Sequence, residues 1–291
     1  MTELSPTDLH FACTDVTIAA SAFGDPSRPP VLLVHGGGQT RHSWTGTARS
    51  LADRGWYAVA YDQRGHGESD RPADKDYRAV KFAEDLVEVV TQVRLLTGRR
   101  PVVVGASLGG LSGLLAEGEL DPGCTAGLVL VDITPRMERS GVDRIVGFMV
   151  DKLEEGFGSL DEAADAVAAY QPHRPRPKDH SGLKKNLRLD DDGRWRWHWD
   201  PDLFVGPSPL GTGSVQQRYD DAAAALTVPT LLVRGKMSDL VSPEMVEHFL
   251  ALVPAADYVD VSGAGHMVAG DRNDVFTDAV ASFLDGLVTQ G

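Results

Sequence analysis

Short apolar runs recur along the chain, and a longer stretch with helical character follows most of them. They do not alternate with polar residues, which is typical of strands buried on both faces of a parallel sheet. The five clearest runs are Val31–Val34, Tyr57–Tyr61, Pro101–Val104, Leu128–Val131 and Thr230–Val233. Two further strands are expected: Tyr258–Val261, and Asp15–Phe23 as an antiparallel edge strand that ends at Gly24-Asp25-Pro26.

The stretches between these runs predict helices, and one of them starts at Ser242-Pro243-Glu244 with an N-cap and a proline in the first turn. Strands that alternate with helices predict βαβ units, and therefore an α/β fold with a doubly wound, mostly parallel sheet. The expected helices are Thr47–Arg54, Ala79–Leu96, Leu108–Glu119, Glu244–Leu252 and Asp274–Leu287.

The alternation stops between residues 134 and 226 and then resumes. This block contains helical stretches but no parallel-strand pattern, so we expect an inserted, mainly helical lid. The predicted organisation is an α/β core in two parts, residues 1–133 and 227–291, separated by a lid at residues 134–226.

Composition narrows the function. The 291 residues carry 28 Lys and Arg against 42 Asp and Glu, a formal charge of −14. This charge disfavours a nucleic-acid-binding protein and docking on an anionic membrane. With two cysteines, no disulfide framework or Cys-based zinc site is expected, and neither metal nor organic cofactor is implied. The polar N-terminus and the lack of a long apolar run predict a cytoplasmic protein. The expected partner is a small-molecule substrate, and the sequence gives no indication of the oligomeric state.

A nucleophile motif follows one predicted strand. Gly105-Ala106-Ser107-Leu108-Gly109 fits G-x-S-x-G, in which a serine sits on a sharp strand-to-helix turn. The crowded backbone of such a turn requires very small residues two positions before and after the serine. The N-terminus of the next helix favours a developing oxyanion, and the N–H of Leu108 is placed to donate to it.

A candidate acid and a candidate base follow Ser107 along the chain, in the order Ser, acid, His. His266 lies in the loop Gly263–Met267 directly after the last predicted strand, at the end of the sheet where α/β proteins place active sites. Asp239, beyond the strand Thr230–Val233, is the favoured orienting carboxylate. Asp132, directly after Leu128–Val131, is the competing choice. The second oxyanion donor is expected from the glycine-rich loop His35-Gly36-Gly37-Gly38.

With these residues in place, the chain resembles the lid-bearing proteins of the α/β-hydrolase fold: epoxide hydrolases, haloalkane dehalogenases, C–C bond hydrolases and small esterases. The resemblance rests on His35-Gly36-Gly37, the Ser107 motif, Asp239, Gly265-His266 and Asp62-Gln63-Arg64-Gly65-His66-Gly67-Glu68-Ser69, which is similar to a family R-G-x-G-x-S loop. It implies that Gly37 is the second oxyanion donor, with Gly38 beside it.

One departure from that group favours acyl chemistry. Its epoxide hydrolases and dehalogenases carry Asp as nucleophile, whereas this chain has Ser107. The prediction is a carboxylesterase-like serine hydrolase that forms an acyl-enzyme on a small, largely apolar substrate. Alternatives on the same residues are a lactonase, a C–C bond hydrolase or a cofactor-free perhydrolase. A hydroxynitrile-type lyase and a non-catalytic ligand receptor are the other classes considered.

The lid carries two further features. Trp195, Trp197 and Trp199 alternate, so they share one face of an extended segment, either as an aromatic wall for an apolar substrate group or as packing of the lid on the core. Phe148 and Met149 either line the pocket or belong to the core of the lid. The predicted substrate-binding residues are Gly38, Phe148 and Trp197. The second feature is a basic island, which could attract an anionic substrate but which we expect to be a solvated face of the lid. It comprises His173, Arg174, Arg176, Lys178, His180, Lys184, Lys185 and Arg188.

Overall fold

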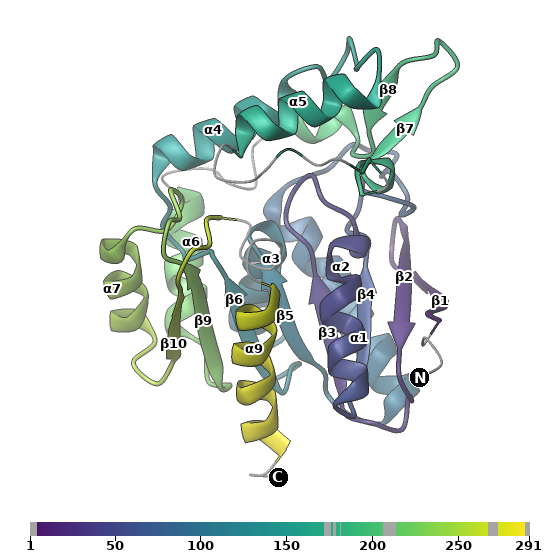
Figure 1. Ribbon diagram of the computed structural model, residues 1–291. Coiled ribbons are helices and arrows are strands. Elements are labelled where there is room, and N and C mark those ends of the chain that lie inside the picture. Colours follow the sequence, from purple (N-terminus) through teal and green to yellow (C-terminus); the bar gives the residue numbers. More distant parts are fainter. Residues whose placement is uncertain are drawn as a thin grey trace.

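The computed structural model describes residues 5–171, 176, 179–180, 182–205, 214–266 and 273–288. Within them a sheet of eight strands has the order β1-β2-β4-β3-β5-β6-β9-β10 (Figure 1). Pairing from β4 to β10 is parallel, and β1 and β2 are antiparallel at one edge. The strands are β1 Thr7–Ala12, β2 Thr17–Phe23, β3 Pro30–Val34, β4 Tyr57–Tyr61, β5 Val102–Ala106, β6 Gly127–Val131, β9 Thr230–Gly235 and β10 Asp257–Val261.

Helices cover both faces of this sheet. α1 (Thr45–Asp53) and α9 (Asn273–Val288) lie on one face (Figure 1). α2 (Ala79–Thr97) and α3 (Leu108–Leu115) cover the other, with α6 (Ser214–Ala224) packed beside α3 and α7 (Pro243–Leu252).

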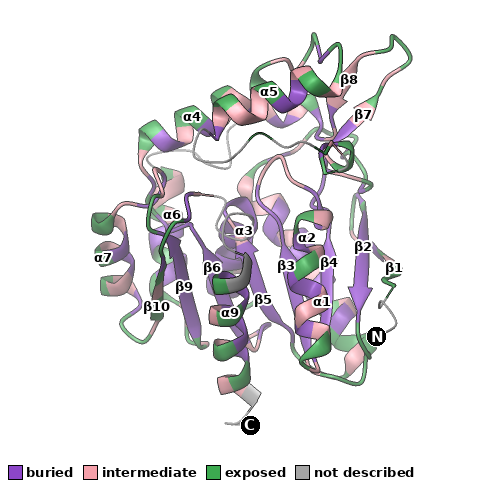
Figure 2. Ribbon diagram, in the orientation of Figure 1, coloured by how far each residue is buried: buried purple, intermediate pink, exposed green. Residues whose placement is uncertain are grey.

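Side chains along each central strand alternate between two hydrophobic cores. In β3, Leu32 and Val34 contribute to the core under α2 and α3, whereas Val31 and Leu33 contribute to the core under α1 and α9. Both sets are buried, which explains the uninterrupted apolar runs in the sequence. Figure 2 shows the same contrast, with buried central strands and exposed outer helix surfaces.

The predicted α/β fold with a mostly parallel sheet is confirmed. In the eight-stranded sheet one strand was missed: β1 precedes the predicted edge strand and pairs only with β2. Most of its residues are exposed, so the continuous apolar signal of the central strands is absent. Among the described residues, no helix is long and apolar enough to cross a membrane.

The chain between β6 and β9 leaves the sheet. Its helices α4 (Arg139–Val150) and α5 (Leu160–Tyr170) and its hairpin β7–β8 (Leu187–Leu189, Trp195–Trp197) lie across one end of the strands (Figure 1). We call residues 134–204 the cap segment. Helix α6, inside the predicted 134–226 insertion, packs instead against α3 in the core layer.

Candidate active site

Ser107 occupies a strained turn between β5 and α3. Its backbone has φ 47° and ψ −116°, a conformation that a residue with a side chain adopts only when its surroundings impose it. A Cβ on Gly105 would overlap the carbonyl of Gly109, and one on Gly109 would lie 2.5 Å from the carbonyl oxygen of Val34. The two glycines of the motif therefore allow the turn, and Ser107 keeps 8% of its surface exposed.

His266 is hydrogen-bonded to Asp132. Its Nδ1 lies 2.8 Å from Asp132 Oδ2, and the Asp132 side chain is fully buried. The carboxylate also accepts the N–H of Gly235 at 2.8 Å and the hydroxyl of Ser238 at 2.6 Å. A buried carboxylate held by these donors fixes the orientation of the imidazole.

The choice of Asp239 as the orienting carboxylate is therefore wrong. The turn after β9 directs Ser238 toward Asp132, and Asp239, the next residue, forms an ion pair at 3.0 Å with Arg144 of helix α4. The Asp239 side chain keeps 35% of its surface exposed. Both aspartates follow parallel strands, and the spacing in the sequence does not reveal which one faces the histidine.

Strand order explains how distant residues meet. β5, β6, β9 and β10 are consecutive in the sheet, and the residues that follow them include Ser107, Asp132, Ser238 and His266. Ser107 also donates its backbone N–H to Val131 at 3.1 Å, directly before Asp132. The structure thus places the predicted nucleophile and base at the same, carboxyl end of the parallel sheet, after β5 and β10, with Asp132 after β6 between them.

The glycine-rich loop passes beside Ser107, since a Cβ on Gly36 would lie 3.3 Å from that of Ser107. Gly36 donates its N–H to Gln39 Oε1 at 2.9 Å, and Gly38 donates to His66 Nε2 at 3.1 Å. No described residue accepts the N–H of Gly37 or of Leu108. Within the described ranges the two predicted oxyanion donors therefore have no acceptor, whereas Gly38 already has a partner.

Apolar side chains of the cap segment cover this loop. A Cβ on Gly38 would lie 2.9 Å from Met149 Cε and 3.2 Å from Trp199. The rings of Trp197 and Trp199 stack with centroids 4.7 Å apart. Phe148 contacts Trp197 at 5.6 Å between centroids.

Phe148 also stacks on Tyr170 at 4.2 Å between centroids, and burial raises the pKa of the Tyr170 hydroxyl. Phe148 and Trp197, both predicted to bind substrate, thus belong to one aromatic cluster that also packs the cap segment together.

The basic island is partly neutralised. Arg176 pairs with Asp161 and Asp165, and Arg188 pairs with Asp190. His173, Arg174 and Lys178 of that set lie outside the described residues.

A sequence model described as the alpha/beta hydrolase fold matches residues 29–272, most of the chain and all the site residues above. The chain belongs to the α/β hydrolase fold family.

The relatives of this α/β hydrolase are named as different kinds of hydrolase. The esterase Rv0045c of Mycobacterium tuberculosis is 30% identical over 269 residues, covering 89% of this chain and 84% of the relative. The 3-hydroxybutyrate-oligomer hydrolase of Cupriavidus necator is 27% identical, covering 90% of this chain and 89% of the relative. Among solved structures, E-2-(acetamidomethylene)succinate hydrolase superimposes with a TM-score of 0.83 at 23% identity, over 97% of this chain and 100% of that one. At that identity the superposition shows the fold alone.

Proposed function

We propose that this α/β hydrolase is a serine hydrolase that cleaves a carboxylic ester or related acyl bond of a small, largely apolar substrate. The observation that carries the proposal is the pairing of His266 with the buried Asp132, which follows β6, the neighbour of the strand β5 that leads into Ser107. The 30% identical esterase supports the same reaction class.

In the proposed reaction His266 acts first as a base and then as an acid in each half-reaction. His266 takes the proton of Ser107 through the ring nitrogen that does not face Asp132, and the Ser107 oxygen attacks the acyl carbon. The N–H groups of Gly37 and Leu108 stabilise the oxyanion. His266 then protonates the leaving alcohol and activates the water that hydrolyses the acyl-enzyme, while Asp132 keeps the imidazole oriented.

The cap segment supports an apolar substrate. Met149 and Trp199 lie against Gly38, one residue from the proposed oxyanion donor, and Phe148 and Trp197 continue the aromatic surface. We assign this cluster to the acyl or aryl group of the substrate.

The test is labelling by a fluorophosphonate, followed by intact mass. We expect one adduct on the wild type, none on Ser107→Ala and much slower labelling of His266→Ala. Ser282→Ala, which removes an exposed hydroxyl of α9, is the matched control and should label like the wild type. Adduct formation that survives in Ser107→Ala would refute the assignment, as would a folded wild type that never reacts.

A further inference from the structure

The 62–69 loop contains a buried histidine, His66, whose imidazole is hydrogen-bonded to the glycine-rich loop His35–Gly38. His66 Nε2 lies 3.1 Å from the N of Gly38, and Nδ1 lies 3.0 Å from the carbonyl oxygen of Arg64. A backbone N–H only donates and a carbonyl only accepts, so Nε2 is the acceptor and Nδ1 carries the proton. His66 is therefore neutral with one defined tautomer, and only 1% of its surface is exposed.

A second histidine joins the same two loops. His35 Nδ1 lies 2.8 Å from the carbonyl oxygen of Gly36, and Nε2 accepts the N–H of Gln63 at 3.0 Å. The Gln63 side chain donates back to the carbonyl oxygen of His35 at 2.7 Å. The two imidazole rings lie 5.1 Å apart between centroids.

These contacts engage the N–H groups on both sides of Gly37 in the described part of the chain. Gly36 donates to Gln39 Oε1, Gln39 donates back to Gly36, and Gly38 donates to His66. Among the described residues, the N–H of Gly37 has no acceptor. Because consecutive peptide groups in a glycine loop can rotate, a fixed acceptor for Gly38 also restricts the orientation of the neighbouring Gly37 peptide group.

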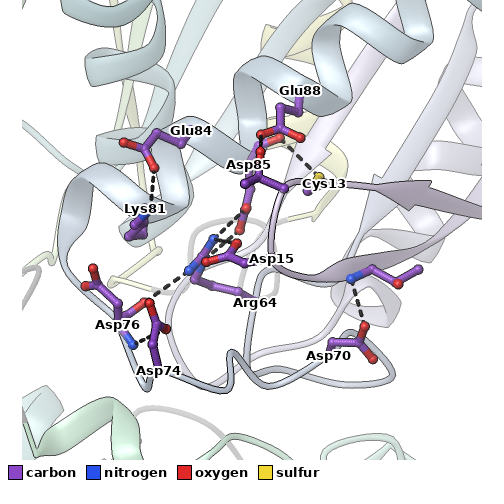
Figure 3. Close-up of polar contacts among 12 residues, drawn as sticks. Cys13, Asp15, Arg64, Asp70, Asp74, Asp76, Lys81, Glu84, Asp85 and Glu88 are labelled. Carbon is purple, nitrogen blue, oxygen red and sulfur yellow. Dashed lines mark hydrogen bonds and ion pairs between the residues drawn. The ribbon is translucent and has the colours of Figure 1, made fainter.

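The 62–69 loop is itself held firmly. Figure 3 shows the Arg64 guanidinium between Asp15 and Asp85. It donates twice to Asp85 at 2.7 Å, to Asp15 at 3.0 Å and to the carbonyl oxygen of Asp76 at 3.1 Å. These bonds connect the loop to α2 and to the β1–β2 turn, and they hold in place the residue whose carbonyl oxygen accepts the hydrogen bond of His66 Nδ1–H.

We propose that His66 is a positioning residue of the oxyanion hole: by accepting the N–H of Gly38 it fixes the glycine loop with the N–H of Gly37 directed to the acyl oxygen. The inference rests on the proposed function. It assigns to His66 no proton transfer and no contact with substrate.

Two variants separate hydrogen bonding from packing. His66→Phe keeps a flat ring and removes the acceptor, whereas His66→Gln retains an amide oxygen that can accept from Gly38. His10→Phe, at an exposed position of β1, is the matched control. Turnover of 4-nitrophenyl butyrate is normalised to the sites that a fluorophosphonate titrates, so a smaller folded fraction does not affect the rate per site.

We expect kcat per titrated site to fall by about 10- to 100-fold in His66→Phe, up to tenfold less than the about 10²- to 10³-fold lost with an oxyanion donor itself, with little change in KM. Inhibition by a trifluoromethyl ketone, which forms the same tetrahedral oxyanion, should weaken by a similar factor. His66→Gln should recover most of both, and hydrogen exchange at Gly38 should be faster only in His66→Phe.

The outcomes are distinct. If His66→Phe matches the wild type in kcat per site and ketone affinity, or if His66→Gln is as impaired as His66→Phe, the inference is overturned while the proposed function stands. A wild type with neither labelling nor turnover overturns the proposed function and this inference together.

Discussion

His266 Nδ1 lies 2.8 Å from Asp132 Oδ2, although these residues are separated by 134 positions and Asp239 is much closer in sequence. The contact exists because β6 is separated from β10 only by β9, and the turn after β9 presents a serine to the same carboxylate. Asp239 instead connects the core to the cap segment through Arg144.

Ser238 is expected to stabilise this turn. Its hydroxyl donates to Asp132 at 2.6 Å and accepts the N–H groups of Leu240 and Val241 at 3.1 Å each. Ser238→Ala leaves these groups without their partner, so we expect the free energy of unfolding to fall by about 1–3 kcal/mol. Urea denaturation measures this, with Ser282→Ala as a control expected within about 0.5 kcal/mol of wild type. Equal stability of both variants would contradict the contact.

Two glycines of helix α4 make a matched pair. A Cβ on Gly141 would overlap the carbonyl of Asp239, whereas one on Gly147 meets nothing within 4 Å. Gly141→Ala should lower the free energy of unfolding by about 1–3 kcal/mol, since the tight contact with the 238–240 turn must open. Gly147→Ala should raise it by about 0.5–1 kcal/mol through better helix propensity. Thermal unfolding that gives both variants the same sign would contradict the packing of α4 on that turn.

The neutral His66 predicts a loss of stability in acid. Burial, aided by the nearby His35, lowers the pKa of His66 from 6.5 to about 3. Below pH 6.5 the unfolded chain binds a proton at this position and the folded chain does not, so stability falls as pH decreases toward 3. The expected contribution is about 1.4 kcal/mol for each pH unit in that interval.

The measurement is the free energy of unfolding of wild type and His66→Gln between pH 7 and pH 4. The difference between the two curves should change with pH by this amount, because glutamine does not titrate. His10→Gln serves as the control at an exposed site. Parallel curves for wild type and His66→Gln would show that His66 is not held neutral in the folded protein.

Much of the core could be predicted from the sequence. Ser107 was identifiable because the turn that exposes it demands Gly105 and Gly109, and the central strands because both of their faces are buried. The orienting acid could not be identified, since Asp132 and Asp239 both follow strands. Only the contacts in the structure show that Ser238 and His266 meet Asp132, whereas Asp239 meets Arg144. The roles of His66 and Ser238 depend on contacts between distant loops, although the Asp62–Ser69 motif marked one of those loops.

The cap segment was the least predictable part. Its aromatic residues were recognised, but the stacking of Trp197 on Trp199 and of Phe148 on Tyr170 depends on how two helices and a short hairpin pack together. A pattern of alternating tryptophans indicates an extended segment and does not say against what it packs.

The central claim is that Ser107 is activated by His266 held on Asp132. The most direct test compares esterase kcat of Asp132→Asn and Asp239→Asn, each normalised to folded protein. We expect Asp132→Asn to lose about 10²- to 10⁴-fold, because an amide cannot hold the required tautomer, and Asp239→Asn to stay within about threefold of wild type. The reverse order of effects, or two equally active variants, would contradict the account.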